Sequence, residues 1–227
     1  MHGQQAAQHQ VDRLDIDGAI RDLSLELRDL DAAALAPDAL ARLRSLDPAS
    51  LPRVPGTPRL GIPFTGTRQF IAVGLNYVDH AAESSQDLPT EPLVFAKFPS
   101  SIVGPGTTIT WDRSVTDAVD FEAELAVVIG RVAKNVKEKD AAAHVLGYTC
   151  INDVTARDLQ RKDVQFARSK GFDTFAPLGP WIVTDFDPAA APVRCLVNGE
   201  VRQDGNTREM IATVYRIVEF ISTFMTL

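Results

Sequence analysis

The spacing of hydrophobic and polar positions changes near residue 63. Before this point, leucines recur at helical intervals between residues 23 and 43. After it, apolar residues alternate with polar ones or form short runs, which is typical of a sheet-rich domain. We therefore expect an α+β fold that is mostly β. Its expected parts are a flexible leader at 1–10, a small N-terminal lobe at 11–46, a proline-rich linker at 47–63 and a main domain at 64–227.

Two features of the sequence support these boundaries: the proline-rich segment at 47–63 and the apolar end of the chain. Residues 47–63 hold five prolines and two glycines, which cannot sustain a helix or a central strand. The last helix, expected from residue 210 onward, stays apolar up to Leu227. Because nothing follows to cover its apolar face, we expect the main domain to be truncated there.

The pattern of the main domain predicts short strands and few helices. Strands are expected at 69–75, 92–96, 107–110, 121–129, 145–151, 181–184, 193–197 and 200–203. The other helices are expected at 77–84, 137–144 and 155–167. The pair Asn198-Gly199 accepts the positive φ angles of a type I′ turn, so the last two strands should form a hairpin.

Composition narrows the class of protein. Hydrophobic residues make up 45% and charged residues 23% of the 227 residues, which excludes disordered and fibrous classes. The net charge of −7 repels a phosphate backbone, so nucleic acid is not an expected partner. No apolar run approaches the ~20 residues that cross a bilayer, so we expect a cytoplasmic protein with no membrane partner. Cys150 and Cys195 are expected to be reduced.

Acidic residues interrupt the apolar strand expected at 121–129. Glu122 and Glu124 stand two residues apart, a spacing that puts both side chains on one face of a strand. A solvent-exposed face would explain them. Alternatively a cation neutralises them, and hard oxygen ligands select Mg²⁺, Mn²⁺ or Ca²⁺. Asp153 follows the strand expected at 145–151 and is either a third ligand or, equally well, the N-cap of the next helix.

His80 and Glu83 form a second candidate pair. Their spacing of three puts both side chains on one helix face, where a carboxylate can orient an imidazole and raise its basicity. The same spacing is common in surface pairs. The pair therefore gains weight only beside the acidic cluster.

Four further side chains are candidates for contacts with a substrate. Lys170 lies between a helix and an apolar segment, and Lys97 ends an apolar strand. Either ammonium could hold a substrate carboxylate or extend to water, and the position of Lys97 favours water. Arg157 and Gln160, one helical turn apart, could face the Asp153 site or a solvated surface.

Five segments together carry a resemblance to a known family. They are 74–83 (GLNYVDHAAE), 121–130 (FEAELAVVIG), 147–160 (GYTCINDVTARDLQ), 170–180 (KGFDTFAPLGP) and 197–200 (VNGE) followed by Gln203 and Thr207. In this order they resemble the fumarylacetoacetate hydrolase family over roughly residues 15–227. Members of that family continue past the segment that matches the end of this chain.

The resemblance implies a catalytic domain of mixed β-sandwich or β-roll type, usually paired as a homodimer, that acts on a small 2-keto or 2,4-diketo acid. It implies Mg²⁺ or Mn²⁺, with Ca²⁺ as a substitute in crystals. The implied metal ligands are Glu122, Glu124 and Asp153. The other implied site residues are a His80–Glu83 dyad that activates water, Lys170 in the active site, and Arg157 and Gln160 beside the substrate.

Several functions are compatible with this set of residues. The first is a metal-dependent hydrolase that cleaves a C–C bond of 2,4-diketo acids through a metal-stabilised enolate. The second is an isomerase of the 2-hydroxyhepta-2,4-diene-1,7-dioate type, or a keto-acid decarboxylase, at the same site. The third is a truncated, non-catalytic member that binds a metal ion or keto acids.

Overall fold

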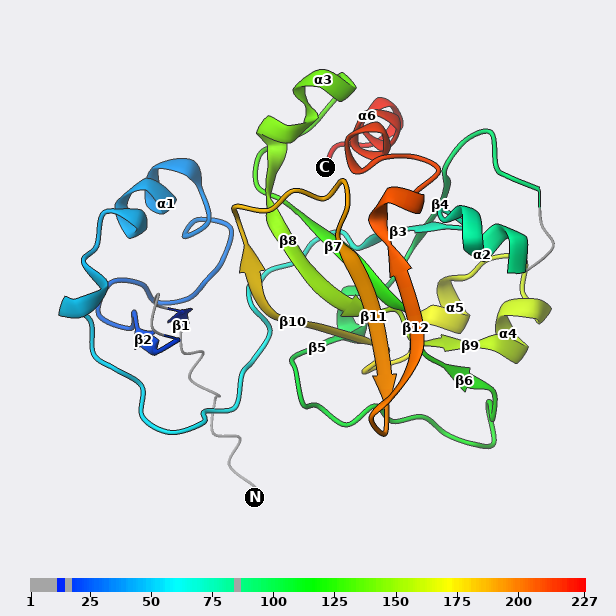
Figure 1. Cartoon of the computed structure of the whole chain (residues 1–227), viewed down its shortest axis with the longest axis horizontal. Helices are drawn as coiled ribbons and strands as arrows, with labels where there is room; N and C mark the ends of the chain where they lie inside the picture. Colours follow the sequence, from blue (N-terminus) through cyan, green and yellow to red (C-terminus); the bar gives the residue numbers. More distant parts are fainter. Residues whose placement is uncertain (1–11, 15–17, 84–86) are drawn as a thin grey trace.

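A small lobe and a larger body make up the structure (Figure 1). The computed structural model describes residues 12–14, 18–83 and 87–227. The lobe, at the left of Figure 1, holds the first two strands and the first helix. The leader expected at 1–10 lies outside the described residues.

The chain forms short strands and short helices, and all of them after β1, β2 and α1 belong to the body. The strands are β1 (Asp12–Leu14), β2 (Ile20–Asp22), β3 (Ile71–Gly74), β4 (Leu93–Ala96), β5 (Ile102–Val103), β6 (Val119–Asp120), β7 (Ala123–Ile129), β8 (Val145–Asn152), β9 (Thr155–Ala156), β10 (Ala176–Val183), β11 (Pro192–Val197) and β12 (Glu200–Asn206). The α-helices are α1 (Pro37–Arg44), α2 (Val78–Glu83), α3 (Glu138–Ala141), α4 (Arg157–Lys162), α5 (Ala167–Lys170) and α6 (Val214–Phe224). This mixed composition, with more strand than helix, confirms the expected fold class.

A four-stranded sheet in the order β5-β10-β8-β7 forms the centre of the body. β8 runs antiparallel to both neighbours, and β10 pairs with β5 in parallel. Within the described part of the chain, β7 is an edge strand of this sheet. The hairpin β11–β12 is a separate two-stranded sheet that passes in front of β7 and β8 in Figure 1, and β11 contacts β7.

Buried apolar clusters fix the parts of the body that surround this sheet. One cluster joins β8, β10 and the incoming chain; it contains Ile151, Ala176 and Leu178, with Phe64 and Phe70 packed against them. A second cluster joins β9, α4 and the segment before β10; it contains Val154, Ala156, Leu159 and Phe175. Burial of a large apolar side chain contributes about 1.5–3 kcal/mol. The end of β8 and the start of α4 are therefore held firmly relative to each other.

The lobe has a small leucine core of its own. Leu23 and Leu51 are buried in it, so a residue of the expected linker contributes to the lobe. Of the helix-spaced leucines, only those within Pro37–Arg44 lie in an α-helix. Thr65 joins the lobe to the body's first segment: its hydroxyl donates to Asp29 Oδ2 and its N–H donates to the carbonyl of Leu30, over 2.9 and 2.8 Å.

Two expected elements are wrong. Residues 107–110 form no strand, and the helix expected at 155–167 is replaced by β9, α4 and α5 with a break between the two helices. Thr155 pairs with Asp120 of β6 instead of starting a helix. Here tertiary strand pairing overrides a helical spacing that is only a weak local preference. The strand expected at 181–184 is also displaced, since β10 begins at Ala176.

The hairpin expected around Asn198-Gly199 is confirmed. β11 and β12 pair antiparallel, with Val197 opposite Glu200. Asn198 and Gly199 have φ angles of 53° and 83°, the positive values that a type I′ turn requires. Local turn chemistry was therefore sufficient to predict this element.

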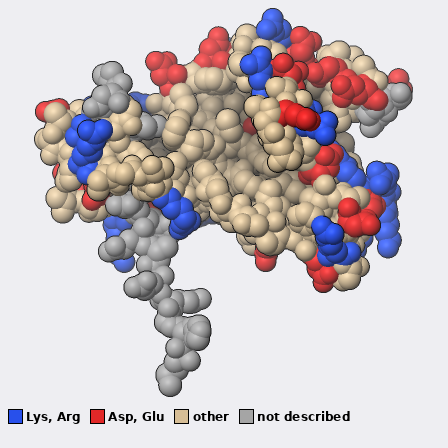
Figure 2. All heavy atoms as spheres, turned by 60° about the horizontal axis from the view of Figure 1, so that its bottom comes forward, with Lys and Arg blue, Asp and Glu red and all other residues tan. Residues whose placement is uncertain are grey.

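The surface carries both signs of charge. On the face shown in Figure 2, acidic and basic side chains lie around the rim of the body and on the lobe, with uncharged surface between them. Among the described residues, no helix has both the length and the apolar character needed to cross a membrane.

Candidate active site

Two predicted acidic residues flank the start of β7. Glu124 lies in the strand, and Glu122 directly precedes it. The backbone of Glu122 is fixed on the β8 side: its N–H donates to Asn152 Oδ1 over 3.1 Å, and its carbonyl accepts from the N–H of Asp153 over 2.8 Å. The pairing of β7 with β8 thus brings all three predicted acidic residues to one end of these strands.

Asp153 lies in the turn between β8 and β9 and is only 6% exposed. α4 begins at Arg157 with Ala156 at its N-cap, so the alternative in which Asp153 caps that helix is wrong. Its carboxylate accepts instead from two ammonium groups, with Lys97 Nζ on Oδ1 and Lys170 Nζ on Oδ2. A buried carboxylate needs such partners because water no longer solvates its charge.

Lys170, the last residue of α5, connects the two acidic segments. Its Nζ donates to Glu122 Oε2 over 2.7 Å and to Asp153 Oδ2 and Thr155 Oγ1 over 2.8 Å each. An ammonium group has three donors, and all three are used here. The side chain is 3% exposed and lies 5.5 Å from the centre of the Phe95 ring. Lys170 therefore holds three residues around one buried charge: one directly before β7, one in the turn after β8 and one in β9.

Lys97, directly after β4, is buried, and the expectation that it extends to water is wrong. Its Nζ donates to Asp153 Oδ1 over 2.5 Å and to the carbonyl oxygens of Lys170 and Phe175 over 2.5 and 3.3 Å. Burial lowers the pKa of Lys97, and the charge of Asp153 opposes that shift. All three donors of Lys97 are bonded to the protein, so Lys97 stabilises the cluster and has no donor free for a substrate.

Arg157 extends the cluster along α4. Its Nε donates to Asp120 Oδ2 over 2.8 Å, and its NH1 lies 2.6 Å from Glu122 Oε1. The same nitrogen donates to Gln160 Oε1 over 3.0 Å. Arg157 and Gln160 therefore face the acidic site, as one of the two alternatives predicted. In all, three cations face the four carboxylates of Asp120, Glu122, Glu124 and Asp153.

Glu124 is the carboxylate that these cations do not bond. It makes no hydrogen bond or ion pair within the described part of the chain. Burial, and then the negative charges of Glu122 and Asp153, raise the pKa of Glu124 to about 8. The hydroxyl of Tyr77 is also buried without a hydrogen-bond partner among the described residues, and the pKa of Tyr77 is raised by burial and by Glu124. The site therefore contains two polar groups that lack a partner.

This raised pKa predicts a pH dependence for the metal-free protein. The folded state keeps a proton on Glu124 that the unfolded chain loses above its ordinary pKa of 4.5. The free energy of unfolding should therefore fall as the pH rises from about 5 to 8, by at most about 1.4 kcal/mol per pH unit from this group. The variant Glu124→Gln should show a flatter dependence. Urea unfolding in EDTA at pH 5, 6.5 and 8 measures it, and identical slopes in both proteins would contradict the assigned pKa.

The donor set suits a hard divalent cation, although the side chains are not arranged around one. Among the described residues, no group of three His, Cys, Asp or Glu side chains forms a metal site as it stands. Nevertheless Glu124 has both oxygens available, and Glu122 Oε2 and both oxygens of Asp153 each accept from one described donor only, which leaves a second lone pair. The buried Tyr77 hydroxyl without a partner also points to a further group in this space. The residues thus fit Mg²⁺ or Mn²⁺ by their chemistry.

His80 and Glu83 both lie on α2 and are exposed. The helix begins directly after Tyr77, the residue whose hydroxyl is near the charge of Glu124. In Figure 1, α2 lies on the same side of the body as α4 and α5. The predicted dyad therefore directly follows Tyr77 in the chain, and both of its side chains are exposed.

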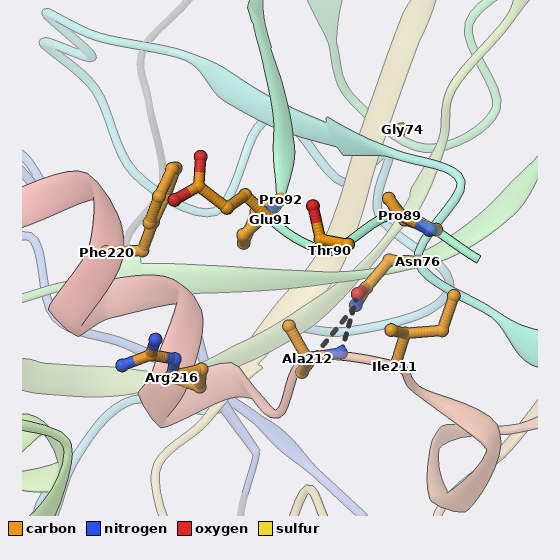
Figure 3. A pocket seen from close by; sticks show the side chains of 10 residues that line it. All are labelled: Gly74, Asn76, Pro89, Thr90, Glu91, Pro92, Ile211, Ala212, Arg216 and Phe220. Atoms are coloured by element: carbon orange, nitrogen blue, oxygen red, sulfur yellow. Dashed lines mark hydrogen bonds between the residues drawn. The ribbon is translucent and has the colours of Figure 1, made fainter.

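A cavity of about 130 Å³ lies beside the other end of β4 (Figure 3). It is enclosed by the end of β3, residues 89–92 and the start of α6. Asn76 stands at its wall and bonds both backbone groups of Ala212, over 2.9 and 3.0 Å. Pro92, which lines the cavity, directly precedes β4, and Lys97 of the acidic cluster directly follows it. The cavity and the acidic cluster therefore lie at opposite ends of this strand. None of the predicted site residues lines this cavity.

Buried lysines that hold carboxylates beside an unpaired glutamate define an acid–base site of the kind that enzymes use. The family described as fumarylacetoacetate (FAA) hydrolase C-terminal matches residues 69–227. The chain therefore belongs to the fumarylacetoacetate hydrolase family of enzymes, and the resemblance seen in the sequence is confirmed.

Several known proteins are similar over most of the chain. A Burkholderia ambifaria protein, named only provisionally as a hydrolase, is 46% identical over 218 residues, which cover 94% of this chain and 77% of that protein. The structure of a fumarylacetoacetate hydrolase from Exiguobacterium antarcticum is 37% identical, with a TM-score of 0.83 over 96% of this chain and 78% of that one. A 2-hydroxyhepta-2,4-diene-1,7-dioate isomerase from Mycobacterium marinum is 43% identical, with a TM-score of 0.64 over 80% and 65%.

Three members of the cluster were not identified from the sequence. Asp120 bonds Arg157, Thr155 accepts from Lys170, and the Tyr77 hydroxyl lies buried near Glu124. Thr155 was hidden by the helix expected at 155–167. Asp120 directly precedes the segment 121–130, and Tyr77 lies within the segment 74–83, so their positions along the chain were an available signal.

Proposed function

We propose that this protein is a divalent-metal-dependent hydrolase that cleaves a C–C bond in 2,4-diketo acids. The observation that carries the proposal is the buried cluster in which Lys170 bonds both Glu122 and Asp153 while Glu124 is left without a partner. Support also comes from the similarity to the Exiguobacterium hydrolase. Glu122, Glu124 and Asp153 would hold Mg²⁺ or Mn²⁺.

When bound, the metal ion would polarise the keto oxygen of the substrate and stabilise negative charge there. Arg157 and Gln160 would orient the bound acid from α4. His80, oriented by Glu83, would take a proton from water as the hydroxide oxygen joins the distal acyl carbon. The C–C bond then breaks, its electron pair goes to the pyruvate-type fragment, and that fragment takes up a proton. The products are a carboxylic acid and a 2-keto acid.

Assays of acylpyruvate cleavage test this function. We expect EDTA to abolish the reaction and Mg²⁺ or Mn²⁺ to restore it. The variant His80→Ala should lose about 10²- to 10⁴-fold in kcat, the usual contribution of a general base. His144→Ala is the matched control, because His144 is a half-buried histidine outside the acidic cluster that bonds the carbonyl of Val132. Rates unchanged by EDTA and by His80→Ala would contradict the proposal.

The second candidate function is isomerisation of a 2-hydroxyhepta-2,4-diene-1,7-dioate. It is favoured by the similarity to the Mycobacterium marinum isomerase. The same side chains would serve, except that a proton moves along the conjugated chain and no water attacks. Conversion of the dienoate by a preparation that leaves acylpyruvates intact would establish this function in place of the first.

A further inference from the structure

Gln203 of β12 holds the one residue that separates Glu122 from Glu124. Its Oε1 accepts from the N–H of Ala123 over 2.8 Å, and its Nε2 donates to the carbonyl of Ala123 over 2.7 Å. The side-chain amide thus replaces the partner strand that an edge residue lacks. Both backbone groups of Ala123 are satisfied by a single side chain.

The need for this contact follows from the sheet. β7 is an edge strand, so alternate residues turn their N–H and carbonyl groups away from β8. β8 fixes the neighbouring residues instead: Glu124 is opposite Ile151, and the backbone of Glu122 bonds Asn152 and Asp153. Gln203 completes the set from the outer side. The backbone between the two glutamates is therefore held from both edges.

A local irregularity in the hairpin lies directly beside Gln203. Cys195 is opposite Gln203, but the next pair is Leu196 with Val201, so Arg202 has no partner residue on β11. Such a bulge changes the direction of the side chains beside it. Asp204 and Arg194 pair on the exposed part of the hairpin over 2.7 Å, whereas Gln203 turns to β7. The hairpin therefore also fixes the backbone of β7 at Ala123, in addition to covering the sheet.

We propose that Gln203 is a positioning residue that sets the relative placement of the Glu122 and Glu124 carboxylates for metal binding. This inference rests on the proposed metal-dependent function. Gln203 acts through the backbone of Ala123. Loss of its amide would free that backbone and widen the range of positions of both carboxylates. Residues that orient metal ligands typically affect metal affinity by about 10- to 100-fold.

Two measurements on Gln203→Met test this role. Methionine fills similar space but cannot make either bond. We expect faster hydrogen exchange of the Ala123 amide, read from the peptide covering residues 121–125. We also expect the Kd for Mn²⁺, measured by calorimetry on the full chain, to rise about tenfold or more, with a thermal midpoint close to that of the control. Gln203→Asn keeps an amide on a shorter side chain, so its exchange rate at Ala123 and its Kd for Mn²⁺ should lie between those of the wild-type protein and of Gln203→Met.

The matched control is Asp204→Asn, which removes an exposed ion pair from the same hairpin and should change neither readout. Unchanged exchange at Ala123 in Gln203→Met would overturn the contact itself. Faster exchange with an unchanged Kd for Mn²⁺ would overturn the positioning role. Absence of Mn²⁺ binding by the wild-type protein would instead contradict the proposed metal dependence, and with it the positioning role, while the exchange result would still report on the contact.

Discussion

Replacement of Lys170 by Met should destabilise the protein and remove its activity together. The change leaves the carboxylates of Glu122 and Asp153 buried around the space where their shared ammonium had been. Removing one partner of a buried ion pair costs about 3–5 kcal/mol, and here, among the described residues, only Lys97 remains to neutralise Asp153 and only Arg157 to neutralise Glu122. Urea unfolding should show this loss, and acylpyruvate cleavage should fall below detection even at temperatures where the variant is folded.

Arg168→Met is the matched control for this variant. Arg168 lies on the same helix and pairs with Asp163, but its side chain is about half exposed. Exposed pairs of this kind contribute little to stability, so its unfolding midpoint should stay at the wild-type value. Equal behaviour of the two variants would mean that the bonds of Lys170 do not hold the cluster.

Replacement of Lys97 by Met should also lower the free energy of unfolding, by about 3–5 kcal/mol. Lys97 is 2% exposed, and its three donors bond Asp153 and two backbone carbonyls. Its loss leaves Asp153 Oδ1 and the carbonyl of Lys170 without a donor, whereas the carbonyl of Phe175 still accepts from the N–H of Val154. We therefore expect a stability defect with little change in KM, because no donor of Lys97 is left for a substrate.

Lys134→Met provides the control for Lys97, since Lys134 is exposed and makes one hydrogen bond to the carbonyl of Thr223. Its unfolding curve should match that of the wild-type protein. The opposite pattern for Lys97→Met, a raised KM with wild-type stability, would restore the hypothesis that this ammonium holds the substrate carboxylate.

Local spacing was sufficient for some parts of the structure. The Asn198-Gly199 turn defines its hairpin by backbone chemistry alone. The interval of two between Glu122 and Glu124 correctly indicated that their charges lie near each other. The local sequence had left Asp153 equally well explained as a third ligand or as a helix N-cap. The family resemblance then placed Asp153 beside the two glutamates.

Contacts across long sequence separations could not be read from the chain. Nothing near Lys97 indicates that residues 153, 170 and 175 will surround its ammonium group, and an apolar strand end is as typical of a lysine that reaches water. The same holds for Thr155, whose pairing with Asp120 replaced the expected helix start. The expected metal ion, the homodimer and the cytoplasmic location stay predictions.

The pairing of β7 with β8 also limits which changes in length the protein can tolerate. Ala123 lies opposite Asn152 at one end, and the register shifts only between Val128 and Ile129, far from the acidic residues. One residue inserted within 123–128 would turn Glu124 to the opposite face of the sheet, because side chains alternate along a strand. The same insertion in the loop at 130–137 would leave that face unchanged. Natural variation in length should therefore be absent from the first half of β7.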